Sequence, residues 1–528
     1  MEREGGLLSR QFPVRVVLLA AALAVLVIAP GCGTDGDPPS RTSHGTGGLA
    51  APSSARRPPL IAVTVRRGAR PRPIPRSFLG LSTEYWTLYL DERHTALWGR
   101  VLSLLHVRGD GPLVLRIGGD SADHAIYEPP TLRRARWAFP LTSRFASRTA
   151  RIVRALHLRV IFDLNLLTAS PTSAAAWVTE TRRVFPPGSI IGYEVGNEPD
   201  LYSHAYWVRS TEPGSFAPLL PGAATPTTYA ADYDAVAQAI RRADPRAALL
   251  GPAVSNPASA LGWIRTLLAR PHPGLSEITA HRYPYSGCAL PESSRHPTIG
   301  EILSEQASAG MAQSVRPMVA LARHAGLSAR LTEFNSVTCG GLRGVSNTFA
   351  TALWAPDAIF ELIRAGLNAA NLHVRVRAIN APFTFGARGL LARPLLYGLI
   401  LFTRTLGPHA QLMPVQVHCP RSLHLKAWAV KVARHKLHVL LIDKGPRAAV
   451  LSLDVPATKP AQVQHLLAPS ARSSSGVTLA GQTLGQNGRW SGPRDIERVT
   501  SQADHYSVTL SPYSAALFSV AEQSRRGS

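Results

Sequence analysis

"IGYEVGNEPDLY", residues 191 to 202, begins with a mostly apolar run. A Gly-Asn-Glu-Pro sequence follows this run directly. The apolar run predicts a buried strand, and Gly196 to Pro199 predict its end and a turn. Glu194 lies inside the run, where we expect a hydrogen-bonded acid of the protein interior. Glu198 lies beyond the last apolar residue, where the strand opens into a loop. It is therefore the better candidate for chemistry.

Similar apolar runs alternate with helix-like stretches from about residue 60 to residue 404. The predicted strands are Phe78–Thr83, Leu113–Ile117, Val160–Leu164, Ile190–Val195, Ala247–Gly251, Glu277–His281, Ala329–Glu333 and Ala370–Val374. Helix-like stretches such as Tyr229–Ala243 and Ser314–His324 lie between them. Eight strands, each followed by a helix, are typical of a (β/α)8 TIM barrel, an α/β fold that we predict for residues 60 to 404.

A different pattern begins at about residue 405. Residues 425 to 445 and 506 to 520 each contain two alternating apolar runs, and Gly, Ser and Pro fill the gaps. We therefore predict a C-terminal antiparallel β-sandwich domain over residues 405 to 522. The early run Ile61–Val65 is a candidate for a further strand of this sandwich, which would tie the two domains together.

The N-terminus has the features of an export signal. Three Arg residues precede the apolar run from Val16 to Ile28, which is too short to span a bilayer as a helix. The run ends in Ala-Pro-Gly-Cys, which resembles a bacterial lipoprotein signal over residues 1 to 32 with Cys32 as the lipidated residue. Residues 33 to 59 are rich in Gly, Pro, Ser and Thr and predict a disordered linker. We expect an exported protein that is anchored to the outer face of the cytoplasmic membrane, or secreted if Cys32 is incidental.

The formal net charge of +24 raises the question of nucleic-acid binding. Nearly all the positive charge comes from Arg residues, which are scattered from end to end without a basic stripe interleaved with aromatic residues. We interpret the charge as a compositional bias whose physical consequence is attraction to anionic surfaces or acidic substrates. Nucleic acid is therefore not an expected partner, and strongly salt-dependent DNA binding would contradict this interpretation.

Three cysteines remain after the N-terminal segment. Their spacing to His residues does not resemble a zinc site, and no metal or other cofactor is implied. In an oxidising compartment Cys288 and Cys339 can pair, which leaves Cys419 over.

Polar and aromatic residues gather at the predicted C-terminal ends of the strands, where barrel enzymes build their sites. The runs are Ser82–Trp86, Arg116–Ser121, Asp163–Asn165, Gly196–Pro199, His281–Tyr285 and Thr332–Ser336. Two carboxylates stand out, Glu198 after the fourth strand and Glu333 after the seventh. Glycoside cleavage needs two acids across the glycosidic bond, and the retaining route places them about 5–5.5 Å apart. The fourth and seventh strands lie roughly across the barrel mouth, so this pairing is geometrically reasonable.

Four segments resemble a known group of enzymes. "LRIGGDS" (115–121), "YEVGNEP" (193–199), "HRYPY" (281–285) and "EFNSVTCGG" (333–341) are similar to segments of the clan A glycoside hydrolases. Within that clan they most resemble the heparanase and β-glucuronidase family, glycoside hydrolase family 79. The resemblance covers about residues 60 to 520, the sandwich included.

The resemblance implies a role for each matching residue. Glu198 matches the acid/base, Glu333 the nucleophile, Asn197 the residue that hydrogen-bonds the sugar 2-hydroxyl, and Tyr283 the tyrosine that holds the nucleophile. Arg116 is expected beside Glu333, where its charge would keep that carboxylate ionised. Further candidate partners of sugar hydroxyls are Glu84, Asp120 and Ser121.

One segment departs from the family. Family members carry a Tyr-Gly pair shortly after the nucleophile, which helps to bind the uronic acid carboxylate. This chain has Thr338-Cys339 there, followed by Gly340. The glycine backbone could still donate an N–H group, and Arg343 or Arg375 could pair with a carboxylate instead.

These features predict a retaining β-glycoside hydrolase that acts on β-glucuronides or uronic-acid-containing glycans. A clan A glycosidase for a neutral sugar, such as a xyloside or arabinoside, is the alternative within enzymes. A catalytically silent, polysaccharide-binding surface lipoprotein is the alternative from another class, but a silent protein would have no chemical need for both acids.

Overall fold

The computed structural model describes residues 60–66, 70–127, 138–203, 224–420, 423–433, 436–457 and 459–521. The predicted signal segment, the lipidation candidate Cys32 and the linker to residue 59 lie outside the described residues, so they stay predictions. Within those ranges, no helix has both the length and the hydropathy that a membrane span requires.

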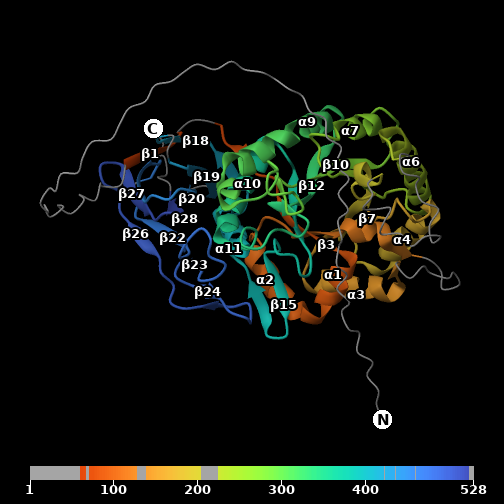
Figure 1. The fold of residues 1–528 in the computed structure, drawn as a ribbon, viewed down its shortest axis with the longest axis horizontal. Helices are drawn as coiled ribbons and strands as arrows, with labels where there is room; N and C mark the ends of the chain where they lie inside the picture. The colour runs from red at the N-terminus through yellow and green to blue at the C-terminus, as the bar shows by residue number, and fades with distance from the viewer. Residues whose placement is uncertain are drawn as a thin grey trace, which may run out of the picture. The chain divides into compact units, whose positions relative to one another are not determined.

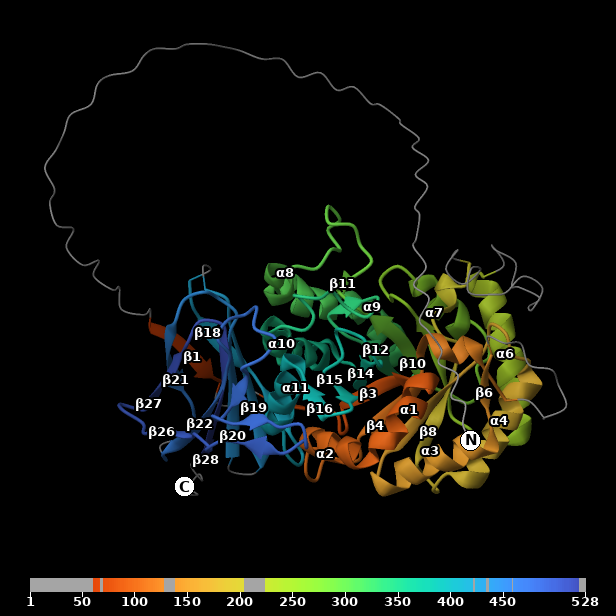
Figure 2. The same ribbon diagram turned by 60° about the horizontal axis from the view of Figure 1, so that its bottom comes forward.

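Eight parallel strands close into a barrel in chain order, as the sequence predicts. They are β3 (Leu79–Glu84), β4 (Val114–Gly118), β7 (Arg159–Leu164), β8 (Ile190–Val195), β9 (Leu249–Val254), β10 (Leu275–Arg282), β12 (Ser328–Phe334) and β14 (Ala369–Val374). Figure 2 shows these strands inside a layer of helices that includes α4 (Pro171–Val184), α6 (Pro226–Ala243) and α7 (Leu261–Leu268). Most strand residues are buried because each strand faces the barrel interior on one side and the helices on the other.

The β-sandwich that follows the barrel consists of two sheets with an apolar core between them, which confirms the predicted C-terminal domain. The four-stranded sheet has the order β18 (Val415–His418), β1 (Leu60–Val65), β21 (Ala449–Asp454) and β27 (His505–Leu510). The larger sheet has the order β2 (Arg72–Pro73), β17 (Gln411–Met413), β19 (Leu425–Ala433), β20 (Lys436–Asp443), β28 (Ser514–Ala521), β22 (Ala461–Leu467) and β23 (Thr478–Leu479), and β26 (Glu497–Val499) pairs with β22.

Strand β1 belongs to the sandwich, which confirms the prediction for Ile61–Val65, although the strand lies within the residues 60 to 404 assigned to the barrel. It pairs antiparallel with β18 and parallel with β21. Its residues alternate between buried and more exposed positions, as in a strand that packs on one face only. The chain therefore passes through the sandwich before it enters the barrel.

Two helices fill the space between the barrel and the sandwich (Figure 1). They are α10 (Phe349–Ala365) and α11 (Pro394–Thr405), and they pack against each other and against β20. Both helices are buried almost all round, which is unusual for the outer layer of a barrel. This position explains why residues 394 to 402, the greater part of α11, are almost all apolar.

Candidate active site

Arg116 on β4 is the centre of the polar cluster at the barrel mouth. Its fully buried guanidinium donates hydrogen bonds to Glu194 Oε2 at 2.8 Å, Asp163 Oδ2 at 2.8 Å and Glu333 Oε1 at 2.6 Å. These carboxylates come from β8, β7 and β12, so one side chain ties four strands together. Burial raises the pKa of Asp163 well above its ordinary value, although the charge of Arg116 opposes this rise.

Glu194 is the interior acid that its position within the apolar run predicts. Its side chain is fully buried, and it accepts a further hydrogen bond from Thr332 Oγ1 at 2.7 Å. Both its carboxylate oxygens therefore accept hydrogen bonds from side chains of the barrel interior, so Glu194 has a structural role.

Glu333 lies near the end of β12 with its side chain 8% exposed. Tyr283 Oη donates a hydrogen bond to its Oε2 at 2.8 Å, and His373 Nδ1 lies 3.4 Å from its Oε1. Burial by itself would raise the pKa of Glu333, but the charges of His373, His281 and Arg116 and the Tyr283 hydrogen bond outweigh it and lower this pKa. The carboxylate is therefore ionised at neutral pH.

Glu198 occupies the turn after β8 with φ of 47°, in the left-handed region that few non-glycine residues adopt. Its backbone N–H donates to the carbonyl oxygen of Ala253, which fixes the turn. The side chain is 17% exposed, about twice the fraction of Glu333, and an oxygen of each carboxylate lies within 4.8 Å of the other. Two acids in different surroundings thus face each other at the barrel mouth.

Two histidines complete the surroundings of these acids. His281 Nδ1 lies 2.9 Å from Glu198 Oε1, and His373 Nε2 lies 3.6 Å from Glu84 Oε1. Burial lowers the pKa of each histidine, but the nearby carboxylates, Glu333 foremost, raise it above the ordinary value on balance. His373 was not among the residues predicted from the sequence, although the end of the eighth strand is where a site residue of a barrel is expected.

Glu198, His281 and Glu333 also have the composition of a metal site. Their ligand atoms lie within 4.8 Å of one another, and they form the one such group in the described part of the chain. The hydrogen bonds from His281 to Glu198 and from Tyr283 and Arg116 to Glu333 account for the side-chain positions without a cation.

Asn197 is held by the arginine at the centre of the cluster. Its Oδ1 accepts a hydrogen bond from Arg116 Nη2 at 3.0 Å, and its backbone N–H donates to Tyr202 Oη at 3.2 Å. These contacts fix the amide so that Nδ2 is the free donor, for which the described residues offer no acceptor. The geometry suits donation to a ligand next to Glu198.

Ser121 is not available to a sugar, in contrast to the prediction. Its side chain is fully buried, its hydroxyl donates to the carbonyl oxygen of Gly118 at 2.6 Å, and it accepts from the backbone N–H of Tyr85 at 2.8 Å. Glu84 Oε2 in turn accepts from the backbone N–H of Ser121 at 2.7 Å. Ser121 therefore stabilises the turn after β4, and Glu84 stabilises the same turn through its hydrogen bond to the Ser121 backbone.

Asp120 is the more accessible acid of that turn, with its side chain 31% exposed. Burial and the charges of Glu84, Glu198 and Glu333 raise its pKa to about 7, against the opposing charge of Arg375. Asp120 is therefore partly protonated at neutral pH, in spite of the arginine 3.4 Å away.

The loops after β10 and β12 are joined covalently at the mouth. Cys288 and Cys339 form a disulfide, and the short strands β11 (Tyr285–Ser286) and β13 (Val337–Thr338) pair beside it. Cys419 is the free cysteine of the described residues.

Gly340 follows this disulfide and lies against Arg375. Its φ is 75°, and a Cβ atom there would come within 3.3 Å of Arg375 Nη2. Among the described residues none accepts a hydrogen bond from the Gly340 N–H. The guanidinium of Arg375, which is one-third exposed, thus lies beside the backbone of Gly340.

Comparison with known proteins gives the fold. No family model and no curated protein sequence matches the chain. Among solved structures, a 4-O-α-L-rhamnosyl-β-D-glucuronidase from Fusarium oxysporum is 17% identical with a TM-score of 0.68, over 87% of this chain and 100% of that one. A family 51 α-L-arabinofuranosidase from Bifidobacterium longum is 14% identical with a TM-score of 0.62, over 87% and 99%. The family 44 endoglucanase Cel44A from Clostridium thermocellum is 13% identical with a TM-score of 0.56, again over 87% and 99%. All three are glycoside hydrolases with different substrates, and this chain shares their fold of a (β/α)8 barrel with a β-sandwich.

Proposed function

We propose that this protein is a β-glycoside hydrolase that retains the anomeric configuration. The observation that carries the proposal is the separation of the two acids, since an oxygen of Glu198 lies within 4.8 Å of an oxygen of Glu333. Retaining enzymes place their carboxyl groups about 5–5.5 Å apart, whereas inverting enzymes need about 6.5–9.5 Å for a water molecule.

Glu333 is the nucleophile in this proposal. Its lowered pKa keeps it ionised, and Arg116 and Tyr283 hold one oxygen each, so the carboxylate is oriented before the substrate arrives. It would attack the anomeric carbon, and the glycosidic bond would break as the covalent glycosyl-enzyme forms. Charge then leaves the carboxylate, and both hydrogen bonds weaken.

Glu198 is the acid that protonates the leaving oxygen and the base that later takes a proton from water. It is the more exposed of the pair, and its hydrogen bond to His281 fixes the direction of the side chain. Asn197, with its Nδ2 free, is placed to donate to the sugar 2-hydroxyl, a contact that strengthens in the transition state.

For the sugar we propose a β-glucuronide or another uronic acid. The resemblance to glycoside hydrolase family 79 supports this class, and so does the position of Arg375 beside Gly340, since its guanidinium could bind a carboxylate where Thr338 replaces the family tyrosine. Because Asp120 is partly protonated, it neutralises Arg375 incompletely and leaves positive charge for the substrate. The likeness of the fold to an arabinofuranosidase keeps a neutral sugar as the second candidate.

The test is an assay of the purified protein on aryl β-glycosides, the glucuronide included. Glu333→Gln should lower kcat by at least about 10⁴-fold, because it removes the nucleophile. Glu198→Ala should retain slow turnover of substrates with good leaving groups, and added azide should restore the rate and give the β-glycosyl azide. An α-glycosyl azide from this variant, or full activity of Glu333→Gln, would disprove the assignment. Cleavage of a neutral glycoside alone would keep the mechanism and exclude the uronic acid.

A further inference from the structure

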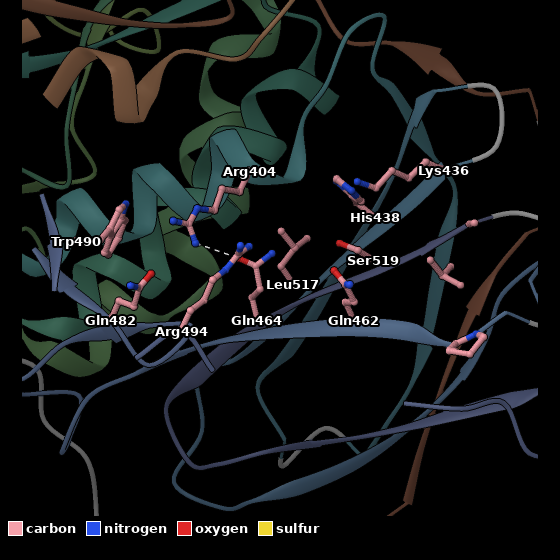
Figure 3. Close-up of a pocket in the computed structure, with 13 residues that line it drawn as sticks. Arg404, Lys436, His438, Gln462, Gln464, Gln482, Trp490, Arg494, Leu517 and Ser519 are labelled. Atoms are coloured by element: carbon pink, nitrogen blue, oxygen red, sulfur yellow. Dashed lines mark hydrogen bonds between the residues drawn. The ribbon is translucent and has the colours of Figure 1, made fainter. Parts of the chain in front are cut away.

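A groove of about 750 Å³ lies outside the barrel mouth, between α11 and the larger sheet of the sandwich (Figure 3). Strands β20, β22 and β28 present the side chains of their outer face to it, and Arg404 reaches it from α11. None of the residues involved belongs to the acid cluster described above.

The groove is cationic and has no acid of its own. Arg404, Arg494 and Lys436 contribute positive charge, and none of the thirteen lining residues is Asp or Glu. Figure 3 shows the side chains of Arg404 and Arg494 extending into the same part of the groove. Burial and the charge of Arg494 lower the pKa of Arg404 to about 10, as expected for a cation that faces another cation. In a folded protein such repulsion favours a bound anion.

The guanidinium of Arg404 is held in place before any ligand binds. Its Nη1 donates to Gln464 Oε1 at 2.9 Å, and its Cζ lies 4.9 Å from the centre of the Trp490 ring. Tyr397 packs edge-on against Trp490 at 5.9 Å, so this ring is fixed from a second side. A fixed guanidinium loses little side-chain entropy on binding an anion.

Neutral hydrogen-bonding groups extend the groove along the sheet. Gln462 on β22 and His438 on β20 both neighbour Ser519 on β28 in the strand register. His438 donates from Nδ1 to the carbonyl oxygen of Thr405, and its Nε2 has no partner among the described residues although it is buried. Burial and Lys436 lower the pKa of His438 to about 4, so this imidazole is neutral. Amide, hydroxyl and imidazole groups beside one fixed and two exposed cations suit a ligand with both hydroxyls and negative charges.

We propose that this groove is a second carbohydrate-binding site, which takes a glycan bearing carboxylate or sulfate groups. Nucleic acid is disfavoured because single-stranded bases need an open aromatic face, and Trp490 is covered by Arg404 and Tyr397. The anion selectivity follows from the groove alone, whereas the glycan as the source of the anion rests on the proposed function. A polymer held here would stay near the enzyme while its ends reach the barrel mouth.

The test is isothermal titration calorimetry of the full protein, carried out with Glu333→Gln so that no probe is cleaved. The probes are polygalacturonate, heparin, neutral dextran and single-stranded DNA. The variant pair Arg404→Gln and Arg494→Gln removes two charges from the groove. The matched control, Arg151→Gln and Arg154→Gln, removes two charges from exposed positions of α3 (Ser143–Ala155). Arg494→Gln alone, at an exposed position, serves if the pair fails to fold.

We expect an anionic glycan to bind about tenfold more weakly or worse to the groove variant, to bind normally to the control, and dextran not to bind. Binding of polygalacturonate would show that carboxylates suffice, whereas binding of heparin alone would show that sulfate groups are required. Equal losses of affinity in the groove and control variants would show that binding depends only on the net charge of the protein, and they would overturn the proposal. Unchanged binding in the groove variant would assign the glycan to the barrel mouth, and tighter binding of DNA would make the groove a nucleic-acid site.

Activity distinguishes this inference from the proposed function. Protein with the wild-type Glu333 and the groove substitutions should cleave small aryl glycosides at the normal rate. If no glycoside is cleaved but the groove still binds glycan, the proposed hydrolysis fails and the site stands. If aryl glycosides are cleaved and no glycan binds in the groove, the proposed hydrolysis stands and the groove site fails.

Discussion

At the scale of single residues, the Tyr283 hydrogen bond to Glu333 is the contact whose removal is easiest to interpret. Tyr283→Phe deletes one hydroxyl that helps to lower the pKa of Glu333. A hydrogen bond to a charged group contributes about 1.5–3 kcal/mol, so kcat/KM should fall about 10- to 100-fold. Because the pKa of Glu333 rises when the bond is lost, the acidic limb of the pH profile should move to higher pH. Tyr285→Phe is the control, since its hydroxyl contacts the carbonyl oxygen of Glu301. An unmoved acidic limb would show that Tyr283 does not act through Glu333.

Asp120 gives a second pH dependence, which concerns binding of substrate. With its pKa raised to about 7, mainly by burial, Asp120 gains its charge as the pH rises through neutrality. The charged form neutralises Arg375, so KM for a uronide should rise above about pH 7, whereas KM for a neutral glycoside should not. Asp120→Asn should remove this dependence of KM on pH. A uronide KM that is flat with pH in the unmodified protein would contradict the role given to Arg375.

The candidate acids could be predicted from sequence because their positions follow from where strands end. Glu198 and Glu333 come directly after or at the end of apolar runs, and the carboxyl ends of parallel strands meet at one face of a barrel. Ser121 could not be excluded in the same way. Whether a hydroxyl in a turn faces a cleft or the backbone depends on the rotamer and on Tyr85, a residue far away in sequence. The contact between His373 and Glu84 likewise depends on barrel closure, which brings β14 beside β3.

At the scale of elements, the disulfide joins the two loops that follow the strands of Tyr283 and Glu333. Replacing both Cys288 and Cys339 by Ser should lower the free energy of unfolding by about 2–4 kcal/mol. Activity at low temperature should also fall, because β11 and β13 would be held together only by their short pairing. Cys419→Ser, which removes the free thiol, should change neither property. Full activity after reduction with a thiol would show that the loops are fixed without the disulfide.

The helices and strands were predictable where their burial produces an apolar pattern in the sequence. All eight barrel strands overlap predicted ones, and most are largely apolar because a strand covered on both faces has few polar residues. Exceptions include β10 (LSEITAHR) and β12 (SARLTEF), which are about half polar and were predictable from their place in the alternation of strands and helices. The place of β1 was harder to predict, since its partners β18 and β21 lie more than 350 residues further along the chain. The runs at 506 to 520 illustrate the same limit, because consecutive strands β27 and β28 enter different sheets.

At the scale of the whole molecule, one buried ion pair connects the barrel to the sandwich. Asp357 on α10 accepts hydrogen bonds from Lys444 Nζ at 2.5 Å and from Trp428 Nε1 at 3.0 Å, and all three side chains are buried. Burial alone would raise the pKa of Asp357, but Lys444 and Lys426 outweigh it and lower this pKa. A lowered pKa means that the stabilisation is present above the ordinary Asp range and is lost as the pH falls through the folded-state value.

Lys444→Met should therefore destabilise the whole protein, because it leaves Asp357 buried in the interface without its cation, either charged or protonated. We expect the free energy of unfolding at neutral pH to fall by about 3–5 kcal/mol. The double variant Asp357→Leu and Lys444→Met should recover part of this loss, since an apolar pair has no charge to desolvate but Trp428 Nε1 loses its acceptor. Urea unfolding followed by circular dichroism measures both, and a single shared transition would show that the barrel and the sandwich unfold together. If the double variant is no more stable than Lys444→Met, the loss comes from packing around Lys444, and the ion pair does not couple the two domains.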